Sequence, residues 1–361
     1  MLDKATSAAM LRRMKEQGLL DLPSTDGDTA DHVKAILQGM RKQTPQQLLD
    51  ALLVEITAGM VPTMAGALPA LGLPGALRVH MVIDWRIDAT ASNGPPYLAV
   101  VSTNLVRFVA SMVSTLNSGI GFRLVDDDGE QDGPALAPRS EREVAQDIKR
   151  LLDGFIAEQR VEALEFGDTP TRHMLQFRLF HCALSWVLGH ELGHIVVSES
   201  RRQKQPLPFE DFVRMQLDGN VNQILADRRY RDQLGGLDER QSAAIREAWL
   251  TELNADVIGA SLACGYQKDH GISRQVPGIV GVTKYAIHLG LLSLSLLDRY
   301  QHLHEPDHPL ATVTHPPLDF RMFCVLSWMY KDRIKEASEA PANYATRVFA
   351  EVLRQAGYDL Y

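Results

Sequence analysis

The chain has 361 residues, of which 45% are hydrophobic and 23% are charged, and this is the composition of a folded protein with a sizeable core rather than of a disordered one. Its 37 basic and 45 acidic residues give a formal net charge of -8, which disfavours nucleic acid and anionic membranes as partners. The three cysteines are scattered and odd in number, so they offer neither a disulfide framework nor a CxxC metal knuckle and fit a reducing, cytoplasmic location.

The chain begins with a region of mixed helical and irregular character. Residues 1–56 mix charges into their apolar positions from the start, unlike a signal peptide, and show helical spacing. Residues 58–77 are uncharged and about as long as a membrane-spanning helix, but their three prolines and four glycines favour an irregular apolar loop. We therefore expect no membrane partner.

Strands are predicted next. Two β-rich runs at 77–85 and 97–103 flank a turn-forming SNGPP, a pattern that predicts a β-hairpin or two strands of a sheet joined by a loop. A helix is expected over about 104–116. Residues 126–141 combine acidic, Gly and Pro residues without periodicity, as a solvated linker does. These features divide the chain into an N-terminal α/β region at 1–125, the linker, and a helical domain at 142–361.

The candidate chemistry begins in a helix predicted over 173–198, whose apolar residues occur on every side, as in a buried central helix. His190, Glu191 and His194 spell HExxH in it. Histidines at i and i+4 project from one face and can grip one metal ion, with the glutamate beside the open coordination position. The alternative is a chance match in which both histidines make ordinary buried hydrogen bonds.

A second predicted helix, at 246–265, supplies acidic groups. Glu252 and Asp256 lie four residues apart and share a face. A catalytic zinc with two histidines takes one glutamate as its third protein ligand, and Glu252 fits that role. Asp256 would then accept a hydrogen bond from the free ring nitrogen of a ligating histidine. A solvent-facing acidic pair is the alternative, and Glu247 is the substitute ligand.

The third element is THPPLDFR at 314–321, just before a predicted helix. Its two prolines could hold His315 rigidly at the rim of a site, where it would stabilise the oxyanion of a tetrahedral intermediate. A capping or loop histidine is the alternative. Arg321 could bind a substrate carboxylate or pair with a nearby acid.

In order, HELGH, ELNAD and THPPLDFR resemble the motifs of the HtpX-like gluzincins, and more closely those of the Lit phage-exclusion peptidases of bacteria. This resemblance covers most of the second domain and implies a zincin-like fold with Zn²⁺ held by His190, His194 and Glu252. It further implies Glu191 as catalytic base, His315 as an active-site residue, elongation factor Tu as substrate and a phage-derived peptide as activator. The spacing between His194 and Glu252 is longer than the family pattern, which would place a different loop over the cleft.

Together these observations predict an α+β, mainly α protein that acts as a zinc metalloendopeptidase, with Glu191 taking a proton from the attacking water. Two alternatives remain: an HtpX-like quality-control peptidase associated with a membrane, and a non-catalytic binding module stabilised by zinc.

Overall fold

The computed structural model describes about three fifths of the chain in separate stretches. These are residues 56, 60, 77–82, 89–91, 97–119, 139–158, 170–207, 209–227, 230, 238–269, 279–305, 309, 312, 314–330 and 334–357. The predicted N-terminal helices, nearly all of the apolar segment at 58–77 and most of the linker at 126–141 lie outside them. The division into two domains stays a prediction.

A small sheet forms the β part of the fold. Its strands are β1 (Leu77–Val82), β2 (Ala89–Ala91) and β3 (Tyr97–Ser102), in the spatial order β1-β3-β2. Both predicted runs are strands, but the hairpin alternative is wrong, because β1 pairs with β3 in parallel. The turn region contributes β2 instead, which pairs antiparallel with β3. The central strand carries the small, β-branched sequence of a strand covered on both faces, and its Ala99, Val100 and Val101 are buried.

Helices make up the rest of the described chain, which is α-rich as predicted. In chain order they are α4 (Thr103–Ser118), α5 (Glu141–Glu158), α6 (Pro170–Gln203), α7 (Glu210–Ala226), α9 (Glu239–Asp269), α10 (Ile279–His304), α11 (Leu318–Tyr330) and α12 (Ile334–Gln355). Local sequence sets several ends. The Ser102 hydroxyl accepts the Leu105 N–H at the start of α4, and Ser140 and Glu143 form a capping box at the start of α5.

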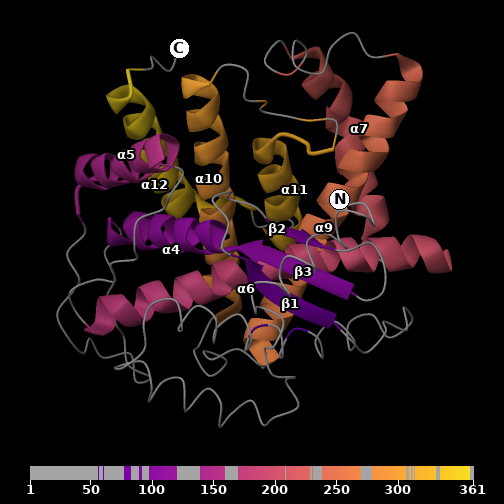
Figure 1. The fold of residues 1–361 in the computed structure, drawn as a ribbon, viewed down its shortest axis with the longest axis horizontal. Helices are drawn as coiled ribbons and strands as arrows, with labels where there is room; N and C mark the ends of the chain where they lie inside the picture. The colour runs from indigo at the N-terminus through magenta and orange to yellow at the C-terminus, as the bar shows by residue number, and fades with distance from the viewer. Residues whose placement is uncertain are drawn as a thin grey trace.

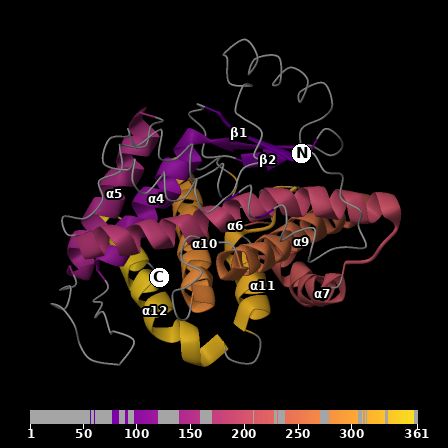
Figure 2. The same ribbon diagram turned by 90° about the horizontal axis from the view of Figure 1, so that it is seen from below.

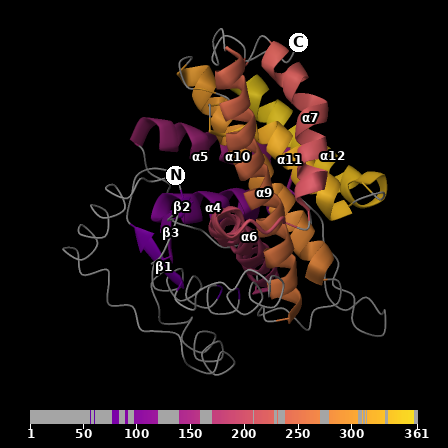
Figure 3. The same cartoon turned by 90° about the vertical axis from the view of Figure 1, so that its right-hand side faces the viewer.

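The long helix α6 lies at the centre of the fold (Figure 1). Figure 2 shows it running across the whole fold, with the strands on one side and α9, α10, α11 and α12 on the other. In Figure 3, β1, β2 and β3 again lie across α6 from α9. A helix that is covered all round needs apolar residues on every face, and this is the pattern of its sequence.

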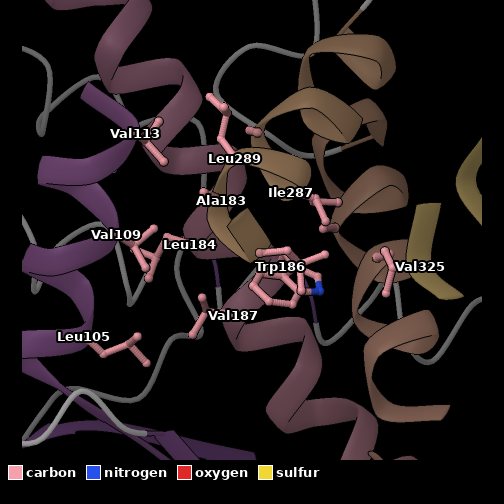
Figure 4. Packing of buried hydrophobic residues seen from close by; sticks show 14 of the residues in the cluster. Leu105, Val109, Val113, Ala183, Leu184, Trp186, Val187, Ile287, Leu289 and Val325 are labelled. Carbon is pink, nitrogen blue, oxygen red and sulfur yellow. The ribbon is translucent and has the colours of Figure 1, made fainter. Parts of the chain in front are cut away.

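One continuous hydrophobic cluster surrounds α6 (Figure 4). Ala183, Leu184, Trp186 and Val187 of α6 pack between side chains of α4 on one side and side chains of α10 and α11 on the other. The labelled residues on those neighbours are Leu105, Val109, Val113, Ile287, Leu289 and Val325. This packing fixes the orientation of α6, and hence the direction in which its polar residues point.

Among the described residues, one helix stretch, Val280–His304, has the length and hydropathy of a membrane span. Two thirds of its apolar window, 67%, is buried against the rest of the chain, as in the core helix of a globular protein. It contains the apolar run at 285–297, for which the sequence predicts a buried helix.

Candidate metal centre

Helix α6 presents three polar side chains in the middle of the core. His190 and His194, one turn apart, face each other with Nε2 atoms 3.1 Å apart. Glu191 lies beside them, with its Oε1 4.0 Å from His190 Nε2. All three are largely buried, at 13%, 10% and 4% exposure of their side chains. Groups this polar are costly to bury unless something pairs with or coordinates them.

Helix α9 crosses α6 at the same level and brings two carboxylates to the histidines. Glu252 Oε1 lies 3.5 Å from His194 Nε2, and Glu252 Oε2 lies 3.8 Å from His190 Nε2. One turn further on, Asp256 Oδ1 lies 2.9 Å from His190 Nδ1. The side chains of Glu252 and Asp256 are 8% and 0% exposed, which excludes the solvent-facing acidic pair.

Glycines make this close crossing possible. A Cβ atom on Gly193 would lie 2.6 Å from the carbonyl oxygen of Ala255, and one on Gly189 would lie 2.7 Å from that of Gly259. A Cβ on Gly259 would in turn lie 2.6 Å from the backbone nitrogen of His190. The two backbones therefore touch at the residues adjacent to the histidines. Sequence reasoning missed this contact, although two glycines flanking HEL at i and i+4 were its signal.

Arg321, in the first turn of α11, closes the other side of the group. Its Nε and Nη2 donate to the two oxygens of Asp256, each at 2.8 Å, and Nη2 lies 3.9 Å from Glu252 Oε2. Of the two roles that the sequence allowed for Arg321, the structure therefore contains the pairing with a nearby acid. Glu247 lies apart, because its exposed carboxylate is close to Arg201 and Arg214 instead.

His315 stands at the rim, where its half-exposed side chain places Nε2 3.6 Å from Glu252 Oε2. The Thr314 hydroxyl contacts its Nδ1 at 2.8 Å, and the His315 N–H donates to the Thr312 hydroxyl at 2.9 Å. The Thr312 carbonyl accepts the indole N–H of Trp249 from α9 at 3.0 Å. The segment is thus tied to the helix that carries Glu252, and His315 is held toward the group by more than its two following prolines.

Electrostatics leave the ligand atoms of His194 and Glu252 in a state suited to a cation. Burial and the neighbouring His190 lower the pKa of His194 to about 3, so its ring is neutral at pH 7. Burial raises the pKa of Asp256, but the Arg321 guanidinium and His190 outweigh it and hold that pKa well below its ordinary value. Burial raises the pKa of Glu252, but the positive charge of the neighbouring Arg321 opposes it, and the pKa of Glu252 lies below its ordinary value.

The residues present fit a bound metal ion. The ligand atoms of His190, His194 and Glu252 all lie within 4.8 Å of one another. Two nitrogens that share a tetrahedral zinc, each at its usual bond length of about 2.0–2.1 Å, would be about 3.3 Å apart, close to the 3.1 Å seen here. Glu252 Oε2 is buried and has no hydrogen-bond partner among the described residues. Among the described residues, the buried carboxylates of Glu191, Glu252 and Asp256 outnumber the Arg321 guanidinium beside them, and a divalent cation would bring positive charge to this group.

A cleft of about 360 Å³ opens onto this group. His190, Glu191, His315 and Arg321 of the group line it, together with Asp298, Gln301 and Thr312 and with apolar side chains mainly of α4, α6 and α10 and of the segment before α11. These apolar lining residues are Ala89, Leu105, Trp186, Val187, Leu294, Leu297, Pro309, Pro316 and Leu318. Two of them, Ala89 and Leu105, belong to the predicted N-terminal region. No described residue of α7 lines the cleft, and residues 231–237 of the stretch between His194 and Glu252 lie outside the described residues, so the expected loop over the cleft stays a prediction.

The seven residues singled out in the sequence therefore converge on one place: His190, Glu191, His194, Glu252, Asp256, His315 and Arg321. All of them except Arg321, for which the sequence left two roles open, have the neighbours expected of them. The catalytic and metal-binding roles of these residues stay predictions. Comparison of the chain with protein-family models, with curated proteins and with solved structures gave no match. The resemblance to the Lit-type peptidases accordingly rests on the three motifs.

Proposed function

We propose that this protein is a zinc-dependent endopeptidase with a gluzincin-type site in a zincin-like domain. The observation that carries the proposal is the buried group of His190, His194 and Glu252 next to a cleft that His190 and Glu191 line. Two histidines and a glutamate form the ligand set of catalytic rather than structural zinc sites, because they leave one position open.

In this mechanism His190, His194 and Glu252 would hold the ion. Bound zinc supplies Lewis acidity, which lowers the pKa of a water molecule and polarises the scissile carbonyl. Glu191 accepts the proton of the attacking water and later passes it to the leaving amine. His315 donates a hydrogen bond to the oxygen that becomes negative. Asp256 holds the ring of His190 through Nδ1, which keeps Nε2 directed at the ion.

The cleft supports a peptide as substrate. Apolar side chains make up most of its lining, beside the charged Glu191, Asp298 and Arg321. Such a cleft can bury an apolar side chain of a polypeptide and leave the polar peptide unit facing the catalytic groups. By resemblance of motifs, we extend the proposal to elongation factor Tu as substrate, with a phage-derived peptide as activator, in the cytoplasm. Purified active enzyme that left elongation factor Tu intact, both with and without phage products, would contradict this extension.

The test of the proposed activity is a comparison of two variants with the native chain. Glu191→Gln should retain about one zinc per chain by elemental analysis and lose peptide hydrolysis, because it removes the base and leaves the ligands. Glu252→Ala should lose zinc as well as hydrolysis. Glu247→Ala is the control, since its carboxylate is exposed and lies away from the cluster. A native chain that bound no zinc after reloading, or a fully active Glu191→Gln variant, would contradict the proposal.

A zinc-stabilised binding module is the competing possibility, and the same experiment separates it. In a module of that kind the native chain would hold zinc as tightly as Glu191→Gln and neither would cleave any peptide.

A further inference from the structure

The Arg321 side chain is engaged more completely than a substrate-binding arginine would be. Two of its three nitrogens, Nε and Nη2, donate to both oxygens of one carboxylate at 2.8 Å. The arginine side chain is 11% exposed and the Asp256 side chain 0%. A bidentate pair of this kind fixes the plane of the carboxylate as well as its position.

The same carboxylate is shared with a predicted metal ligand. Asp256 Oδ1 accepts a hydrogen bond from Nη2 of Arg321 at 2.8 Å and lies 2.9 Å from Nδ1 of His190. The contact therefore runs from α11 through α9 to α6. Arg321 also approaches the second acid of α9, since Nη2 lies 3.9 Å from Glu252 Oε2.

We propose that Arg321 is a positioning residue for the metal centre. Its guanidinium locks the Asp256 carboxylate so that Oδ1 holds His190 Nδ1 and directs Nε2 of that ring toward His194 and Glu252. This inference rests on the proposed function, and it assigns to Arg321 a role other than recognition of a substrate carboxylate. A substrate carboxylate could take the Nε–Nη2 fork only by displacing a buried aspartate that is already bound through two hydrogen bonds.

A residue that acts through another on a metal ligand should alter metal affinity. Loss of such an outer partner typically weakens metal binding by about 10- to 100-fold. Arg321→Gln should therefore weaken zinc binding by that amount, measured by competition with a chromophoric chelator. Arg321→Lys keeps the charge without the planar fork and should recover only part of the affinity.

A second arginine–aspartate pair at α11 provides a matched control. Arg299 of α10 pairs with Asp319 in the first turn of α11 and does not line the cleft next to the histidines. Arg299→Gln removes an arginine–aspartate pair at α11 and should leave zinc affinity within about twofold, the spread expected of a site without contact to the ligands. Equal losses in Arg299→Gln and Arg321→Gln would mean that docking of α11 alone is responsible, and would overturn the proposal.

Two further measurements isolate the path through Asp256. If Arg321 acts through this carboxylate, Asp256→Asn combined with Arg321→Gln should bind zinc no more weakly than Asp256→Asn alone, whereas independent effects would multiply. The second measurement needs no metal: ¹⁵N-histidine NMR should find His190 protonated at Nδ1 in the native chain and a mixture of tautomers in Arg321→Gln. An unchanged tautomer in that variant would overturn the proposed role of Arg321, whether or not the native chain binds zinc. Absence of zinc binding by the native chain would instead count against the proposed peptidase.

Discussion

A methyl group on Gly193 would enter the contact between α6 and α9. The Cβ of Gly193→Ala would lie 2.6 Å from the carbonyl oxygen of Ala255 and 2.7 Å from its Cα, both of them backbone atoms that no side-chain rotation can move away. Ordinary contact begins at 3.4 Å, so the helices must separate by about 0.8 Å, the difference between 3.4 and 2.6 Å. Overpacking of this kind costs about 1–3 kcal/mol of stability.

Alanine is also a better helix former than glycine, and a control is needed to remove that contribution. Gly154 in α5 has no atom within 4 Å of its ideal Cβ, so Gly154→Ala should gain about 0.5–1 kcal/mol from helix propensity alone. Urea unfolding followed by circular dichroism should place Gly193→Ala about 1–3 kcal/mol below Gly154→Ala, the cost of overpacking. Equal or greater stability of Gly193→Ala would refute the close crossing.

Three further predictions follow from the same geometry. His315→Ala should leave bound zinc unchanged and lower kcat by about 10²- to 10³-fold, the usual loss for one oxyanion donor, and a normal kcat would remove His315 from the mechanism. Chelation should lower the melting temperature of the native chain, and added zinc should raise it again as its concentration grows; Glu252→Ala should respond to neither. Burial lowers the pKa of His181 to about 3, below its unfolded value of about 6.5, so the unfolded chain binds the extra proton and stability falls as pH drops below about 6.5. His181→Gln should flatten the pH dependence of the unfolding free energy by up to about 1.4 kcal/mol per pH unit in that range, and an unchanged slope would contradict the assigned shift.

The parts of the fold that depend on local sequence could be predicted. Apolar residues on all sides of the HELGH segment predicted a buried helix, and α6 is one. Spacing alone put Glu252 and Asp256 on one face of α9, and that face meets the histidines. Local chemistry was sufficient because HELGH and ELNAD each lie within one helix, where residues four apart are neighbours whatever the rest of the chain does.

The parts that depend on partners distant in the chain could not be predicted in full. The parallel pairing of β1 with β3 leaves no local pattern, and β2 is only three residues long. The contact of Gly193 with Ala255 depends on two helices whose relative placement no motif specifies. The pairing of Arg321 with Asp256 was one of two roles open to this arginine, and only the position of α11 selects it.

The longer spacing between His194 and Glu252 predicted a different loop over the cleft, but the described part of the inserted residues does not line the cleft. The inserted residues contribute α7, whose Val213, Leu217 and Val221 are buried and which packs against α9. No described residue of α7 lines the cleft, whereas Leu105 of α4 and Leu294 and Leu297 of α10 do. Replacing Leu297 by alanine should therefore change which peptides are cleaved, while replacing the exposed Met215 of α7 by alanine should not. A peptide-library profile altered by Met215→Ala and unaltered by Leu297→Ala would show that the recognition surface lies on α7 and not in this cleft.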